Sequence, residues 1–152
     1  MFDNIKTFHK KFLRVMSSRQ LRILGYNGGS WTNGGCLILA KALRCWSKNK
    51  FQLAVVISGG IMQHFFVMTP GNYALDGDGL QTLPVFYDKM VNLEQLNNPS
   101  LVFLDDNQTF NVKHYPFNLI ATSIQDIPCC PVKIQKTFNL LNKVFGSYKK
   151  YF

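Results

Sequence analysis

The feature that most constrains the fold is a glycine-rich segment that leads directly into an apolar one. Residues 25–35 read GYNGGSWTNGG, and residues 36–46 continue as CLILAKALRCW. The five glycines among these eleven residues favour a loop with tight turns or close backbone contacts. The apolar spacing of the following segment predicts an α-helix. Cys36 is therefore expected at the N-terminus of a helix.

Three further segments show helical spacing. Apolar residues recur every three or four positions over residues 2–16, and the segment that begins at Pro131 has the same pattern. Residues 84–97 show it more weakly. We expect helices over all three segments, with Pro131 in a first turn, where proline is well tolerated.

Short apolar segments between these helices predict strands. The segments are residues 53–58, 61–69, 72–76, 101–105 and 109–115. A turn at Pro70-Gly71 should join the second and third segments in a hairpin, and a turn around Asp106-Asn107 should join the last two. The order predicts an α+β fold, in which an antiparallel sheet packs on the helix that begins at Cys36.

Composition favours one folded domain over residues 1–152. Hydrophobic residues make up 47% of the chain and charged residues 16%, the opposite of the balance found in disordered chains. The longest apolar runs, such as LAVVI, are too short to span a bilayer. The N-terminal segment lacks the continuous apolar run of a signal peptide. We expect no membrane span.

The cysteines do not form a disulfide or zinc pattern. There are four, Cys36, Cys45, Cys129 and Cys130; two are adjacent, and none has the CxxC spacing of a structural zinc site. We expect reduced thiols in the cytoplasm, with Cys45, Cys129 and Cys130 in the core. No cofactor is expected. No metal is expected either, because the DGDG sequence at residues 76–79 lacks the closing acid of a calcium loop.

His64 interrupts an apolar strand, where a polar ring needs a partner. A three-residue loop after Thr69 would pair that residue with Tyr73, so residues of equal parity would share a face of the sheet. His64 would then lie opposite Asp78, with Asp76 as its diagonal neighbour. Both carboxylates would be within side-chain reach. The alternatives are a structural histidine and an ordinary Asp-Gly turn.

Cys36, His64 and Asp76 together favour nucleophilic catalysis. A helix N-terminus lowers the pKa of a thiol, and its N–H groups can bind an oxyanion. A neutral imidazole at His64 would take the thiol proton, and Asp76 would orient the imidazole. Asp78 is the alternative third member. For Cys36 alone, a buried structural cysteine is the competing interpretation.

GGCLILAKAL at residues 34–43 and HFFVMTPGNYALDGDG at residues 64–79 resemble the papain-like cysteine hydrolases, a broad group that includes NlpC/P60 amidases and transglutaminase-like proteins. In this group a helix begins at the nucleophilic cysteine, and a histidine and its polar partner follow on the sheet. The resemblance covers about residues 25–80. It implies a protease, amidase or deamidase that forms a thioester at Cys36. A peptide bond, an isopeptide bond or a side-chain amide of a protein or peptide could be the substrate.

The oxyanion side departs from papain-type enzymes, which commonly carry a glutamine where this chain has Ser30. The Cys36 N–H is one possible donor. The other candidates for oxyanion or substrate contacts are Asn27, Asn33, Trp31 and Gly35. For Trp31, the alternatives are the substrate cleft and the core.

The net charge of +9 supports a different function. A basic surface attracts nucleic acid or an acidic protein partner, so the chain could be a binding protein on an inactive papain-like scaffold. The abundance of Asn, Lys, Phe and Tyr suggests an AT-rich genome, which fits a viral, phage or bacterial effector acting in a host cytoplasm. Solvated faces of ordinary surface helices are the other explanation of the charge.

Overall fold

The structure is a computed structural model that describes residues 2–104, 112–114, 119–121 and 129–152. Its helices are α1 (Phe2–Leu24), α2 (Cys36–Trp46), α3 (Leu83–Asn92) and α4 (Pro131–Phe145), followed by the 3₁₀ helix η2 (Gly146–Tyr151). Its strands are β1 (Gln52–Ser58), β2 (Ile61–Met68), β3 (Tyr73–Asp76), β4 (Gly79–Thr82), β5 (Ser100–Leu104), β6 (Val112–His114) and β7 (Leu119–Ala121). The predicted α+β class is confirmed.

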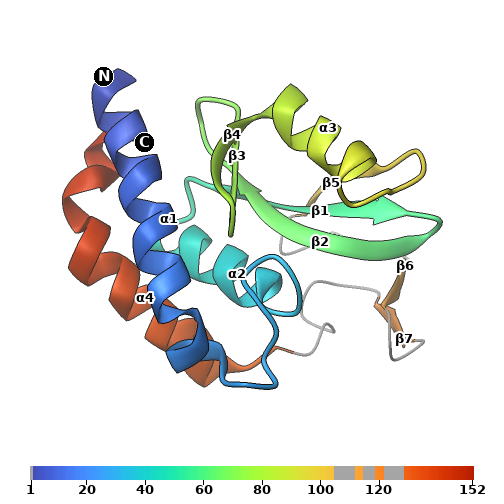
Figure 1. Cartoon of the computed structure of the whole chain (residues 1–152), viewed down its shortest axis with the longest axis horizontal. Coiled ribbons are helices and arrows are strands. Elements are labelled where there is room, and N and C mark those ends of the chain that lie inside the picture. The colour runs from blue at the N-terminus through green and yellow to red at the C-terminus, as the bar shows by residue number, and fades with distance from the viewer. Residues whose placement is uncertain (1, 105–111, 115–118, 122–128) are drawn as a thin grey trace.

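Five strands form an antiparallel sheet in the order β4-β3-β2-β1-β5 (Figure 1). Strand β6 joins β2 in parallel at one residue pair and runs antiparallel to β7. The expected hairpin between residues 101–105 and 109–115 is wrong for the described residues, because β5 pairs with β1 and β6 pairs with β7. Its turn at Asp106-Asn107 lies outside the described residues.

Both faces of the sheet are covered by helices, as Figure 1 shows. Odd-numbered side chains of the central strands, such as Leu53, Val55 and Phe65, pack with α1, α2 and α4. Even-numbered ones, such as Val56 and Phe66, pack beneath α3. Alternation in a strand sends successive side chains to opposite faces, and this explains why β1 is apolar at nearly every position.

The hairpin of β2 and β3 has the predicted register. Val67 pairs with Leu75 and Met68 with Ala74, and the Thr69 N–H donates to the Tyr73 carbonyl over 2.9 Å. The two strands pair no further, so β3 leaves β2 after the second pair. The half of β2 that contains His64 is therefore free of β3 along this edge.

Buried contacts with α1 fix the position of the glycine-rich loop. The Trp31 ring is buried, and its Nε1–H donates to the Met16 carbonyl over 2.8 Å. A Cβ at Gly35 would lie 2.6 Å from the Leu24 side chain and 2.7 Å from the Ser30 carbonyl oxygen, so only glycine fits at the start of α2. The loop thus fixes Cys36 at a helix N-terminus, as predicted.

Other expectations need correction. Helix α1 continues beyond residue 16 to Leu24, because Met16 and Ile23 extend its buried stripe. Cys45 and Cys130 are exposed and Cys129 is half-buried, so none of the three is a fully buried core residue. Among the described residues, no helix combines the length and the apolar character that a membrane span needs.

Candidate active site

Cys36 is the first residue of α2, and its side chain is almost fully buried. Its sulfur accepts hydrogen bonds from the main-chain N–H groups of Leu37 and Phe65. The Leu37 N–H is free because the first turn of a helix has no intrahelical acceptors. The Phe65 N–H is free because β3 has already left β2 at this point. The sulfur therefore takes the place of the missing strand partner.

His64 comes from β2 and lies between two oxygen atoms. Its Nε2 is 2.9 Å from Asp76 Oδ2, and its Nδ1 is 3.2 Å from the main-chain carbonyl oxygen of Thr32. The ring also forms a hydrogen bond with Cys36. Because both ring nitrogens face acceptors, the site favours the doubly protonated imidazolium, in which both nitrogens donate.

The titration of His64 reflects these contacts. Burial is the largest influence and lowers its pKa, but the hydrogen bonds and charges of Asp76 and Cys36 outweigh it and raise the pKa to about 9. At neutral pH the ring is therefore a cation.

The thiol of Cys36 responds in the complementary direction. Burial is the largest influence and raises its pKa, whereas the hydrogen bond and positive charge of His64 lower it. The two main-chain N–H groups add to the effect of His64, and the pKa ends below its ordinary value. Together the two residues favour a thiolate–imidazolium pair.

Asp76 is a buried carboxylate with four donors. Its Oδ2 accepts from His64 and from Lys89 Nζ at 2.8 Å, and its Oδ1 accepts from the Asp78 N–H at 2.9 Å and from Gln81 Nε2 at 3.2 Å. Burial raises its pKa, but the hydrogen bond and charge of His64 and the charge of Lys89 lower it below the ordinary value. Asp76 therefore stays ionised despite its burial.

Asp78, the alternative third member, lies elsewhere. Its carboxylate is half-exposed and accepts from Lys89 Nζ at 2.9 Å. No hydrogen bond joins it to His64 among the described residues. The structure therefore brings Asp76, and not Asp78, to the imidazole, and Asp78 instead supports the lysine behind Asp76.

Lys89 is the site residue that sequence analysis missed. It comes from α3, and its ammonium lies between the two carboxylates and 5.0 Å from the ring centroid of Phe86. The centroid of the Phe86 ring lies 4.4 Å from that of Phe66 of β2, with the ring planes tilted by 38°, and this contact anchors α3 to the sheet. No spacing in the sequence relates Lys89 to Asp76, because the contact depends on how α3 crosses the sheet.

A pocket of about 130 Å³ opens beside the imidazole. It is lined by Thr32, Gln63, His64, Lys89, Met90, Glu94 and Leu96. Its volume fits a small group such as one side chain of a substrate. Cys36 does not line this pocket and is only 9% exposed, so the pocket itself does not reach the sulfur.

The predicted oxyanion and substrate residues divide into two groups. Asn27 and Asn33 are exposed on the loop, and their side chains form no hydrogen bond with described residues. Trp31 is a core anchor, which excludes the cleft alternative, since its ring is 2% exposed. Gly35 is buried, and a Cβ there would meet the chain's own Leu24 and Ser30.

Comparisons with known proteins add no relative: no protein-family model matches the chain, and neither curated proteins nor solved structures give a significant match. A buried thiolate, a cationic imidazole and an ionised carboxylate in hydrogen-bonded sequence can perform nucleophilic attack and proton transfer.

Proposed function

We propose that this chain is a cysteine-dependent hydrolase or acyltransferase that acts on amide bonds, with Cys36 as nucleophile, His64 as acid and base, and Asp76 as the residue that orients His64. The observation that supports this most is the alternation of charge through the buried site. Thiolate, imidazolium, carboxylate and the Lys89 ammonium follow one another, so each charge is stabilised by its neighbours. A purely structural cysteine needs no such arrangement.

The first half of the reaction forms a thioester. The Cys36 thiolate attacks the carbonyl carbon of the amide, and the negative charge moves to the carbonyl oxygen. Main-chain N–H groups at the start of α2 stabilise that oxygen. The imidazolium of His64 then gives its proton to the amide nitrogen, the C–N bond breaks, and the amine leaves.

The second half regenerates the enzyme. Neutral His64 accepts a proton from water, or from an acceptor amine or alcohol, as its oxygen or nitrogen attacks the thioester carbon. The carbon–sulfur bond breaks and Cys36 leaves as a thiolate. Water yields hydrolysis or deamidation, whereas another nucleophile yields acyl transfer. Asp76 keeps the Nε2–H of His64 directed away from the sulfur through both halves.

The test is competition between thiols within one molecule. A limiting amount of iodoacetamide is added at intervals from about pH 5 to 9, and the alkylated sites are quantified by mass spectrometry. Cys45 and Cys130 are matched controls, because both are exposed. Cys36 should be labelled faster than either well below pH 8 despite its burial, and His64→Ala should remove this advantage.

Slower labelling of Cys36 than of Cys45 at every pH would contradict an activated nucleophile. So would an advantage that His64→Ala leaves unchanged. With reactivity established, the thioester is sought directly by intact-mass measurement after incubation with peptide amides, using Cys36→Ser as the control.

A further inference from the structure

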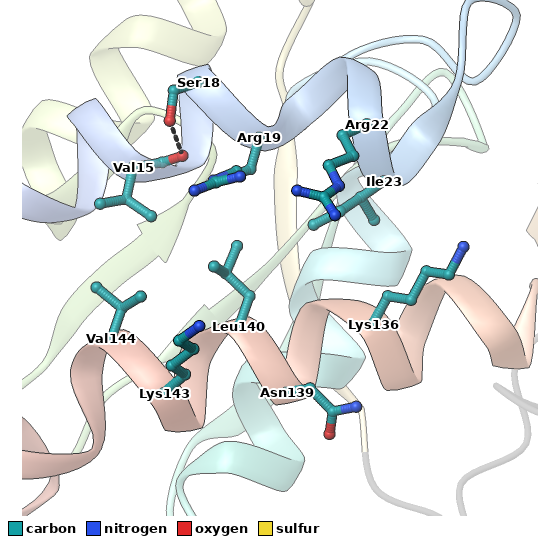
Figure 2. Close-up of a pocket in the computed structure, with 10 residues that line it drawn as sticks. All are labelled: Val15, Ser18, Arg19, Arg22, Ile23, Lys136, Asn139, Leu140, Lys143 and Val144. Atoms are coloured by element: carbon teal, nitrogen blue, oxygen red, sulfur yellow. Dashed lines mark hydrogen bonds between the residues drawn. The ribbon is translucent and has the colours of Figure 1, made fainter.

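A second concave site lies between α1 and α4, away from the imidazole pocket. Figure 2 shows the two helices side by side, with side chains from both directed into the space between them. The space has a volume of about 530 Å³, the volume of a ligand or of several side chains. The aliphatic residues of its lining are Val15, Ile23, Leu140 and Val144.

The polar part of this lining is cationic. Arg19 and Arg22 project from α1, and Lys136 and Lys143 project from α4, so positive charge stands on both sides (Figure 2). None of the described residues that line the space is acidic. We call the site the basic groove, defined by these four cations and the four aliphatic residues between them.

The four cations differ from neighbouring lysines in their contacts with the described part of the chain. Among the described residues, none of them forms a hydrogen bond, an ion pair or a cation–π contact. Two neighbouring lysines show the contrast: Lys11 Nζ donates to the Val144 carbonyl at 3.1 Å and Lys133 Nζ to the Leu24 carbonyl at 2.7 Å. Those lysines hold the two helices together. The groove cations instead repel one another, which an anionic occupant would relieve.

We propose that the basic groove binds an acidic amphipathic segment of a protein partner. Acidic side chains of the segment would pair with the cations on both sides, and its apolar side chains would cover the aliphatic floor. An amphipathic helix laid into a groove has this pattern, with apolar anchors at spacings of three and four. Charge complementarity selects the acidic partner, and the aliphatic floor selects one with an apolar face.

The aliphatic residues of the basic groove also argue against nucleic acid as its ligand. Single-stranded nucleic acid is bound by basic residues together with aromatic rings on which bases stack. In the part of the chain that the structure describes, no aromatic residue lines the basic groove. A phosphate backbone would use the cations but leave Ile23, Leu140 and their neighbours facing charged groups.

The groove is connected to the candidate active site along the chain. Arg22 and Ile23 line one end of the groove, α1 ends at Leu24, and the loop that carries Cys36 begins at Gly25. A segment bound in the groove would thus lie beside that loop. That the partner is also the substrate rests on the proposed function, whereas binding itself does not require Cys36.

The experiment measures fluorescence anisotropy with a labelled peptide of about 16 residues, with Leu at helical spacing and Glu at the other positions. A second peptide has Ser in place of Leu. The groove variant is Arg19→Glu with Lys136→Glu. The outer-face variant, Lys10→Glu with Arg14→Glu, makes the same change of charge at exposed positions outside the groove.

The proposal expects the groove variant to bind the Leu–Glu peptide at least about tenfold more weakly than wild type, and the outer-face variant to stay within about twofold. The Ser–Glu peptide should bind more weakly than the Leu–Glu peptide, and Cys36→Ala should bind like wild type. Equal losses in both variants, or no binding of the Leu–Glu peptide to wild type, overturns it. Tighter, groove-dependent binding of an oligothymidylate also overturns it, in favour of nucleic acid.

Failure of the proposed function gives a different pattern. In that case the peptide binds through the groove, but Cys36 is not selectively alkylated. Failure of the groove proposal alone leaves the alkylation of Cys36 intact and removes only the groove-dependent binding.

Discussion

At the residue scale, Asp76 and Cys36 together keep His64 charged. The imidazole is buried, and burial alone lowers its pKa, so the cation exists because of the carboxylate 2.9 Å away and the sulfur on its other side. Asp78 is close in the sequence, but among the described residues its carboxylate bonds to Lys89 and to no imidazole nitrogen. The two acids therefore make a matched pair for mutagenesis.

Asp76→Asn should lower the pKa of His64 from about 9 toward or below its ordinary value, because the amide keeps an acceptor but loses the negative charge. Asp78→Asn should leave the pKa of His64 within about 0.5 of its wild-type value. The pKa is measured from the chemical shift of the His64 ring protons as a function of pH. A similar shift in both variants would contradict the role assigned to Asp76.

Gly77 tests the packing behind the site. A Cβ there would lie 2.7 Å from the Trp31 Cβ and 2.9 Å from the Thr32 Cγ2, both in the loop that precedes Cys36. Gly77→Ala should lower the free energy of unfolding by about 1–3 kcal/mol, measured by urea denaturation. Gly146→Ala is the control, since nothing lies within 4 Å of its added Cβ. Equal effects of the two would contradict this packing role.

Residue identities in the site were only partly predictable. Cys36, His64 and Asp76 followed from local rules, the helix start and the parity of a three-residue hairpin loop, and the structure brings them together. Trp31 and Lys89 depended on distant contacts, with α1 in one case and with the β-sheet in the other. Local patterns carry no information on such contacts.

At the scale of elements, predictability followed the distance between partners along the chain. Helix α2 and the register of β2 with β3 are set within a few residues, and both predictions are confirmed. The pairing of β5 with β1 joins residues that are 43 to 51 positions apart in the sequence. The alternation that predicted a local hairpin for β5 could not identify that distant partner. Strand β4 was missed because its four residues, Gly-Leu-Gln-Thr, include a single apolar side chain.

Helix α3 is the element that supplies Lys89, and Phe86 is its main anchor. The ring is fully buried against Phe66. Phe86→Ala should cost about 3–5 kcal/mol of unfolding free energy and release Lys89 from Asp76. Tyr87→Ala, at a neighbouring position that is 39% exposed, should cost less than about 1 kcal/mol. Thermal and urea denaturation of both variants provides the comparison, and similar losses would contradict the anchoring role.

At the scale of the whole molecule, charge acts on stability in two ways. Buried pairs such as Lys89 with Asp76 are screened little by salt, whereas exposed charges are screened strongly. The net charge of +9 and the facing cations of α1 and α4 therefore produce a repulsion that added salt should relieve.

Raising NaCl from about 20 to about 200 mM should raise the Tm of the wild-type protein. At low salt, the groove variant should have a higher Tm than wild type, since it already lacks the repulsion between the two helices. Its Tm should therefore rise less than that of wild type when salt is added. The same addition of salt should raise the Tm of the outer-face variant more than that of the groove variant. Differential scanning calorimetry gives all three values, and an equal gain in the two variants would show that the repulsion is not located in the groove.

Stability should also depend on pH through His64. Its pKa rises from 6.5 to about 9 on folding, so the stabilisation from its charge is complete below about pH 6.5 and is lost as pH rises through 9. Asp76, with a lowered pKa, contributes above about pH 4 and loses its contribution as pH falls through its folded value. The stability difference between wild type and His64→Gln, from urea denaturation, should therefore shrink between about pH 7 and 10. A constant difference would contradict the raised pKa.

The contact between His64 Nδ1 and the Thr32 carbonyl has a consequence for how this site can change over generations. The oxygen belongs to the main chain, so every residue type at position 32 supplies it, and a scan of side chains would pass over it. A single substitution can remove the Asp76 carboxylate, whereas the Thr32 carbonyl oxygen is lost only if the loop changes its conformation. The protonation of the imidazole therefore depends partly on the conformation of the loop and not only on side chains. A comparison of side-chain identities alone would underestimate how strongly the protein favours the protonated ring.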